Sequence, residues 1–367
     1  MNKNRLIERF MRYCACPSES GDEREFALLI EKELQDLGLE TWRDEIGDKC
    51  NSNGFNVHAF LPGEGEPMLF SAHLDTTVPG KVVNPVLKED RICSDGTSVL
   101  GSDDKSGIAA VMEALECLKE NPRPHRPIEI FFSICEELGL LGAENADYSK
   151  IKSRQAVVLD GGIPGCVMNQ TAGIMRMKVE ITGKASHSAL DPNGGVNALK
   201  AAAEIVCRTQ LGYHDDGDAV INIANLHAPG EGNMVSDKVT FDVELRAFSE
   251  EILKKRQDYV LGIIEDVCSA TAGLSYTWKE TLRTAILHVP TDSPLLQRVD
   301  AVLSAMNAKP RLLKSFAGCD ASHLDLNGIA AVDYGTGMQA IHSTEEFILI
   351  DDLVKTTVFV ENMMEPV

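Results

Sequence analysis

Several features that would assign the sequence to other classes of protein are absent from it. No apolar stretch approaches the length that a helix needs to span a bilayer. Positive charge is scarce, because 35 Lys and Arg residues stand against 56 Asp and Glu residues. The resulting net charge of -21 argues against binding to nucleic acid or to anionic membrane surfaces. No Gly-x-Gly-x-x-Gly motif follows the early strands, which argues against a dinucleotide-binding enzyme.

The ten cysteines also lack an organised pattern, since they are scattered and show no paired zinc-finger spacing. The first residues, Met1–Leu6, are followed by an amphipathic pattern and not by the apolar run of a signal peptide. We therefore expect reduced thiols, mostly in the core, in a cytoplasmic protein.

The residues that are present predict a globular α/β protein of more than one domain. Hydrophobic residues make up 44% and charged residues 25% of the 367 positions, a length that exceeds one typical domain. Ser20 and Glu23 have the spacing of a capping box. Apolar spacing predicts helices at 3–16 and 21–37 and strands at 40–45, 54–60 and 68–72.

The pattern changes near residue 174 and resumes near 285. Between these points the order is strand, helix, strand, strand, helix, strand, which is typical of a ferredoxin-like domain. We therefore expect a catalytic domain in two parts, 1–173 and 285–367, with an α+β domain inserted at 174–284.

The apolar run Met68–Ala72 is followed directly by His73 and Asp75. The run predicts a buried strand that delivers both polar residues to its carboxyl end, where ligands of such sheets bind. Residues two apart on a strand point the same way, so Asp75 can accept a hydrogen bond from His73 while the other imidazole nitrogen faces a metal ion. A solvated His-Asp pair is the simpler alternative for this dyad taken alone.

Asp103 and Asp104 stand just before a predicted apolar helix at 108–118. Two acids at this position can be explained as favourable charges at a helix amino terminus. That explanation suits Asp104 better than Asp103 if a metal ion is near.

Further acidic residues follow two other predicted strands. A strand at 128–134 ends at Glu136 and Glu137, whose charges repel each other unless a cation or a shared proton separates their roles. An exposed pair of loop residues is the alternative. A strand at 155–159 ends at Asp160, and the two glycines after it allow the backbone to pass close to a site.

Histidine and carboxylates without cysteine suit zinc, manganese or cobalt in a hydrolytic site. The residues that would form it fall at strand ends or loops of one predicted sheet: His73, Asp75, Asp103, Glu136, Glu137, Asp160 and His342.

These segments resemble the ordered motifs of the two-zinc peptidase family that includes peptidase T, carboxypeptidase G and aminoacylase. Within that family the chain looks most like the peptidase T-like tripeptide aminopeptidases, and the resemblance covers nearly its whole length. The segments are His73-Leu74-Asp75-Thr76, Gly101–Gly107, Glu136-Glu137-Leu138-Gly139, Asp160-Gly161-Gly162 and Ile341–Phe347.

The resemblance implies two zinc ions that share Asp103. His73 and Asp160 would complete one site, and Glu137 and His342 the other. Five ligands for two ions that each need about three protein contacts also require one shared carboxylate. The resemblance further implies a cis peptide between Asp103 and the residue after it.

The resemblance also assigns Asp75 to orienting His73 and Glu136 to general base catalysis. Two cations lower the pKa of a bridging water and polarise the scissile carbonyl. Because Glu136 neighbours a ligand, it is close enough to take the proton of that water and pass it to the leaving amine.

In the inserted domain, Gly183–Ala189 resembles the lid motif of the family, in which His187 would stabilise the oxyanion. A turn histidine is the alternative. Asn233 and Arg246 resemble substrate-binding positions, although a surface ion pair would also explain Arg246. We expect the insertion to act as a lid and to form a homodimer, with His187 working in cis or in trans.

The sequence therefore predicts an aminopeptidase that acts on small peptides, most of all tripeptides. An amidase or deacylase of N-acyl amino acids and an inactive metal-binding relative are the alternatives. Ala317–Ala321 departs from the Gly-Gly-Thr/Ser-Asp pattern commoner in the family, which leaves the substrate open.

Overall fold

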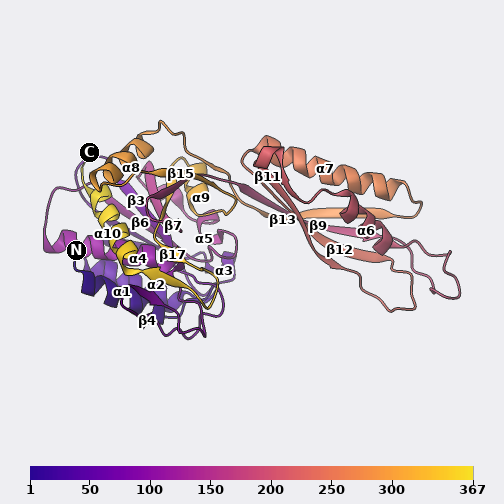
Figure 1. The fold of residues 1–367 in the computed structure, drawn as a ribbon, viewed down its shortest axis with the longest axis horizontal. Coiled ribbons are helices and arrows are strands. Elements are labelled where there is room, and N and C mark those ends of the chain that lie inside the picture. The colour runs from indigo at the N-terminus through magenta and orange to yellow at the C-terminus, as the bar shows by residue number, and fades with distance from the viewer. Residues whose placement is uncertain (367) are drawn as a thin grey trace. The chain divides into compact units, whose positions relative to one another are not determined.

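The computed structural model describes residues 1–366, which fold as two compact units. Unit 1 consists of Met1–Thr171, Leu287–Ser315 and the residues from Cys319 on, and unit 2 consists of Ala172–Ile286 and Phe316–Gly318 (Figure 1). The sequence pattern does not indicate that Phe316–Gly318 joins unit 2. This segment belongs to unit 2 because of aromatic packing: the centroid of the Phe316 ring lies 4.7 Å from that of Phe248 and 5.9 Å from that of Tyr213.

Unit 1 contains a nine-stranded mixed sheet, which confirms the predicted α/β class. Its strands run in the order β1-β2-β6-β3-β7-β16-β8-β14, and β15 pairs with β8. The central strands β6, β3, β7 and β16 run parallel to one another. The pairs β1-β2, β2-β6, β16-β8 and β8-β14 are antiparallel, and β15 is parallel to β8. The bounds are β1 Glu40–Asp44, β2 Asn56–Leu61, β3 Met68–His73, β6 Ile128–Ser133, β7 Gln155–Gly161, β8 Cys166–Thr171, β14 Leu287–His288, β15 Arg311–Ser315 and β16 Ala330–Gly335.

Helices cover this sheet because its central strands are apolar on both faces. All six residues of β3 are buried. Helix α4 packs on β3 and β7, with α1 and α10 against it (Figure 1). The bounds are α1 Lys3–Ala15, α2 Arg24–Asp36, α3 Gly47–Cys50, α4 Ser102–Glu120, α5 Leu141–Glu144, η1 Tyr148–Lys150, α8 Pro294–Ala305, α9 Ala321–Leu326 and α10 Ile350–Met364.

A second, four-stranded sheet in unit 1 was not predicted. Its strands are too short to show alternation, with bounds β4 Val86–Leu87, β5 Arg91–Cys93, β17 Met338–Gln339 and β18 Phe347–Leu349. It joins the segment before α4 to the segment that carries His342.

The capping box predicted at Ser20 and Glu23 is wrong. Helix α2 begins at Arg24, and no side chain caps it. Ser20 Oγ instead donates to Asp75 Oδ2 at 2.7 Å, and Glu23 accepts from the backbone of Gly21 and Cys135. These tertiary partners occupy the groups that a local cap would have used.

Unit 2 has the predicted strand and helix order with one extra short strand. Its antiparallel sheet runs β10-β11-β12-β9-β13, and α6 and α7 pack on the face formed by alternating apolar residues. The bounds are β9 Gly173–Thr182, α6 Ala198–Arg208, β10 Gly212–His214, η2 Asp215–Gly217, β11 Ala219–His227, β12 Lys238–Ala247, α7 Glu250–Ser269 and β13 Ser275–Arg283.

All ten cysteines are free thiols and eight of them are buried, as expected for core thiols. Within residues 1–366, no helix combines the length and the apolar character needed to cross a membrane.

Candidate metal and catalytic site

His73 is the last residue of β3, and its buried ring has three carboxylates close to its two nitrogens. Its Nε2 atom lies 3.0 Å from Asp103 Oδ1 and 3.6 Å from Asp160 Oδ1. Its Nδ1 atom lies 2.9 Å from the carbonyl oxygen of Asp75 and 3.4 Å from Asp75 Oδ1. The pairing predicted for this dyad is therefore present, but the backbone of Asp75 is the closer acceptor.

Asp103 lies between the two histidines of the site. One carboxylate oxygen faces His73, and the other lies 3.2 Å from His342 Nε2. The peptide bond that follows Asp103 is cis, as the resemblance implies. Asp104 has a different environment, because its two oxygens accept the backbone N–H groups of His73 and Gly107 at 3.2 and 3.3 Å.

The start of α4 and the two residues before it are held by Glu346, whose role the sequence did not reveal. Glu346 is 1% exposed and accepts from the backbone N–H groups of Leu100, Gly101 and Asp103. It also accepts from Ser102 Oγ at 2.6 Å. Glu346 is more than two hundred positions from these partners, so the local sequence carries no sign of the contacts, although Glu346 stands in the motif that contains His342.

Glu136 and Glu137 lie in the turn after β6, and Asp75 fixes that turn. The Asp75 carboxylate accepts from the backbone N–H groups of Glu136 at 2.9 Å and Glu137 at 3.2 Å. Cys135, just before them, has φ 52°, a left-handed conformation that turns the chain into the site. Glu137 Oε1 lies 2.8 Å from His342 Nε2, and Glu136 is buried.

The protein groups of this site leave negative charge poorly balanced. Burial raises the pKa of Glu136 well above its usual range, and the charge of Asp160 adds to this shift. Burial and the charge of Asp103 raise the pKa of Asp160 to about 8.

Asp103 differs from these two carboxylates. Burial opposes its ionisation as well, but hydrogen bonds from His342 and His73 lower its pKa. The same two carboxylates that contact His342, Asp103 and Glu137, raise its pKa to about 10.

Two more buried aspartates stand behind the first set, and the sequence analysis missed both. Asp333 accepts the backbone N–H of Asp160 at 3.0 Å, and Asp320 accepts from Ser133 Oγ. Burial raises the pKa of Asp320 to about 6 and that of Asp333 well above its usual range. The sequence did not single out Asp320 or Asp333, because an isolated Asp after a loop or inside a strand forms no motif with distinctive spacing.

Four of the five predicted ligands fall in two groups whose candidate ligand atoms lie within 4.8 Å of one another. The groups are His73, Asp104 and Asp160, and His73, Asp103 and Glu137. His342 is in neither group, although its Nε2 atom contacts Asp103 and Glu137. Imidazole and carboxylate donors with uncompensated negative charge fit a divalent cation such as zinc, manganese or cobalt. The first group contains Asp104 where Asp103 was predicted.

Residues 69–365 match Peptidase family M20/M25/M40. The chain belongs to this family. The match spans both units and includes every residue that the sequence analysis placed in the site.

Within the M20/M25/M40 family the chain is peptidase T-like. It is 28% identical to the uncharacterized protein YqjE of Bacillus subtilis, with 100% of this chain and 99% of that protein covered. It is 25% identical to peptidase T of Vibrio parahaemolyticus, with 98% of each chain covered.

Solved structures of this family share the fold. The aminopeptidase PepT of Bacillus cereus superposes with a TM-score of 0.93 at 28% identity, covering 99% of this chain and 98% of that one. A tripeptidase of Staphylococcus aureus superposes with a TM-score of 0.94 at 26% identity, covering 100% and 98%.

The remaining predicted residues lie in unit 2. His187 is exposed, and its Nδ1 atom accepts from the backbone N–H groups of Ala189 and Leu190, both at 3.2 Å. His187 forms an isolated β-bridge with Met234. The preceding residue of that segment, Asn233, accepts the backbone N–H of Ser188 at its carbonyl at 2.8 Å.

Arg246 forms an ion pair, which was the alternative to a substrate-binding role for this residue. Its Nε atom lies 2.9 Å from Glu244 Oε1, and its Nη1 atom donates to the carbonyl of Phe316 at 2.7 Å. Both contacts are within unit 2.

Proposed function

We propose that the chain is a metal-dependent aminopeptidase that releases the amino-terminal residue from small peptides. The observation that carries the proposal is the unbroken series of contacts from His73 through Asp103 to His342 and Glu137, with buried Glu136 beside it. The similar proteins named peptidase T and tripeptidase support this substrate class.

Two divalent ions, zinc in the first instance, fit the donor set. His73, Asp103 and Asp160 would hold one ion, and Asp103, Glu137 and His342 the other. Asp104 stays outside the set because both its oxygens are occupied by backbone N–H groups. Such ions supply an acidified water and a polarised carbonyl. We expect a metal-loaded crystal structure to show Asp103 in contact with both ions, and Asp103 turned away from them would contradict the assignment.

Glu136 acts as the general base in this proposal. Its burial and its acidic neighbours favour holding a proton, which suits a group that takes a proton from water and gives it to the leaving amine. Asp75 positions the base, because its carboxylate holds the backbone of Glu136.

His187 serves as the oxyanion donor. Because Nδ1 accepts two backbone N–H groups, the proton of a neutral ring is on Nε2, which is therefore a donor. Asn233, next to His187, and Arg246 would bind the substrate, and the Glu244 contact would orient the Arg246 guanidinium.

Unit 2 serves as the lid and as the contact between two subunits of a homodimer. Its sheet has edge strands at β10 and β13, and nine-residue β13 offers unpaired backbone groups to a second copy. Either subunit could then supply His187 to a given set of metal ligands.

An assay of the zinc-loaded protein against dipeptides and tripeptides with free and acetylated amino termini tests the function. We expect hydrolysis of the free peptides only, with the first residue released. Cleavage restricted to acetylated substrates would indicate the amidase or deacylase alternative. Full metal loading without hydrolysis of either set would indicate an inactive metal-binding relative.

A further inference from the structure

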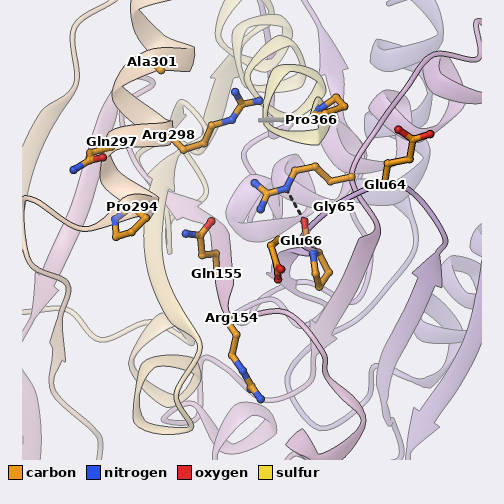
Figure 2. A pocket seen from close by; sticks show the side chains of 12 residues that line it. Glu64, Gly65, Glu66, Arg154, Gln155, Pro294, Gln297, Arg298, Ala301 and Pro366 are labelled. Carbon is orange, nitrogen blue, oxygen red and sulfur yellow. Dashed lines mark hydrogen bonds between the residues drawn. The ribbon is translucent and has the colours of Figure 1, made fainter.

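A pocket lies at the amino ends of the parallel strands of unit 1, opposite the candidate site at their carboxyl ends. It has a volume of about 740 Å³ (Figure 2). Pro67, Arg126 and Gln155, which line it, stand at the amino ends of β3, β6 and β7, whereas the candidate site stands at the carboxyl ends. A six-residue strand is roughly 20 Å long, so the two sites are separate.

Three arginines line this pocket in a chain whose net charge is -21. They are Arg126, Arg154 and Arg298, which come from three different segments. Among residues 1–366, no carboxylate forms an ion pair with any of them, although Glu64 and Glu66 also line the pocket.

Arg126 is the decisive member, because its guanidinium is buried without a full set of partners. The residue is 3% exposed, and its Nε atom donates to the carbonyl of Glu66 at 2.8 Å, the contact drawn as a dashed line in Figure 2. Its Nη1 atom is buried with no hydrogen-bond partner among the described residues. Burial, with the positive charge of Arg298, lowers the pKa of Arg126. The charge of Glu66 opposes this shift but does not outweigh it, and the two side chains, both among the described residues, form no ion pair. A buried cation without a paired carboxylate is costly, and an anion in contact with it would relieve that cost.

Of the three arginines, only Arg298 has contacts that account for its position by a structural role. Its Nη2 atom donates to the carbonyls of Asn362 and Glu365 near the end of α10, a common position for a cation. Arg126 places only its backbone N–H on this helix, at the carbonyl of Met364, and Arg154 is exposed. Apart from the contact of Arg126 Nε with Glu66, the guanidinium groups of Arg126 and Arg154 have no protein partner among the described residues and can bind a ligand.

The lining between the arginines is apolar or neutral. Pro67, Pro294 and Ala301 contribute apolar surface, and Gln155 and Gln297 contribute amides. Figure 2 shows Gln297 and Arg298 on the same helix, α8, with the Arg298 side chain extending toward Pro366. Arginine forks favour planar or tetrahedral oxyanions, and the apolar wall favours a compact body attached to one.

We infer that this pocket binds a small organic oxyanion, with a carboxylate or phosphate group at Arg126 and Arg154 and a compact neutral body against Pro67 and Pro294. The inference does not depend on the proposed peptidase activity, because the pocket shares no residue with the candidate site.

Calorimetric titration of the zinc-loaded full chain tests it with four probes: phenyl phosphate, benzoate, inorganic phosphate and neutral benzamide. We expect phenyl phosphate or benzoate to bind at one site per chain, and the stronger of the two identifies the oxyanion. Inorganic phosphate should bind more weakly because it lacks the body, and benzamide should not bind.

Arg154→Gln removes an exposed guanidinium with no described partner, so it should not disturb folding. We expect it to weaken the preferred probe about tenfold or more, the scale of one charge-assisted contact. Arg126→Lys keeps the charge but removes the fork and should weaken binding by at least as much. Arg208→Gln, an exposed arginine of unit 2, is the matched control and should bind like the parent chain.

Equal affinity of the parent chain, Arg154→Gln and Arg126→Lys for every probe would place any bound anion elsewhere and overturn the inference. Binding of inorganic phosphate as tightly as phenyl phosphate, unchanged by either substitution, would likewise mean an adventitious ion only. Turnover is not measured, so failure of the proposed function cannot produce either result.

Discussion

At the scale of single residues, the two adjacent glutamates after β6 have different surroundings. Glu137 contacts His342, whereas Glu136 is buried with its backbone held by Asp75. Identical side chains one position apart thus have different environments, and the proposed function assigns them different roles, metal binding to Glu137 and proton transfer to Glu136.

We expect Glu136→Gln to keep its metal and its fold but to lose turnover by about 10² to 10⁴, because an amide cannot accept a proton from water. Glu137→Gln should instead lower the bound metal, measured by atomic absorption after dialysis. The two substitutions control for each other. Near-normal turnover in Glu136→Gln together with two retained ions in Glu137→Gln would contradict the assignment.

A second prediction at this scale concerns His323, which is 5% exposed and has an unpartnered Nε2 atom. Burial lowers the pKa of His323 to about 4. The folded pKa is below the ordinary value of about 6.5, so the unfolded chain binds more protons between these values. The contribution of His323 therefore destabilises the fold progressively as pH falls from about 6.5 to about 4.

We expect His323→Leu to remove this part of the pH dependence. Relative to the variant, the parent chain should lose about 1 kcal/mol of unfolding free energy between pH 7.5 and 5.5, since one pKa unit corresponds to about 1.4 kcal/mol. Urea unfolding at the two pH values measures the difference. His227→Gln, an exposed histidine of unit 2, is the control, and an identical pH dependence in His323→Leu and the parent chain would refute the prediction.

At the scale of elements, the start of α4 depends on a residue more than two hundred positions away. Glu346 gathers three backbone N–H groups and one hydroxyl from Leu100–Asp103, and the small sheet of β5 and β18 brings it there. The position of Asp103 is thus set by a carboxylate on another segment.

We expect Glu346→Gln to lower the free energy of unfolding by about 2–3 kcal/mol, because the neutral amide is a weaker acceptor and brings its own donors toward N–H groups. Metal affinity should fall as well, since outer-shell partners commonly contribute 10-fold to 100-fold. Denaturant unfolding and metal competition titrations measure the two effects. Glu345→Gln, its exposed neighbour, should change neither, and an unchanged metal affinity in Glu346→Gln would argue against the coupling.

At the scale of the whole molecule, the candidate oxyanion donor and the candidate metal ligands belong to different units. In the proposed function, an oxyanion donor on one unit would reach the metal ligands of the other only after closure, which suits a donor that must work in a site without water. The proposed homodimer raises the further question of which subunit supplies His187.

We expect His187→Ala to lower kcat by about 10²–10³ with metal content unchanged, the scale for one oxyanion donor. If the residue acts in trans, mixing His187→Ala with Glu136→Gln subunits should restore part of the activity, because one mixed site has both groups. An unchanged kcat would remove His187 from the mechanism. A strictly monomeric protein by light scattering would exclude the trans arrangement.

Much of the fold followed from local patterns. The buried strand at Met68–His73, the two helices at the amino-terminal end of the chain and the alternating strands of unit 2 are determined by apolar periodicity. The placement of His73, Glu137 and Asp160 also followed from sequence, because a strand that ends in His, Asp or Glu places that side chain at the carboxyl end of the sheet. Asp103 and His342 follow no predicted strand directly and were proposed from the motifs that resemble the family.

Only the tertiary structure decided how these side chains are held. Four buried carboxylates accept hydrogen bonds from segments far along the chain, namely those of Asp75, Glu346, Asp320 and Asp333. Ser20 and Glu23 likewise bind distant partners and do not cap helix α2. The arginine pocket likewise joins Arg126, Arg154 and Arg298, which share no motif. Periodicity reports which way a side chain faces, whereas its partner depends on which distant segment packs there, and one chain read residue by residue does not contain that pairing.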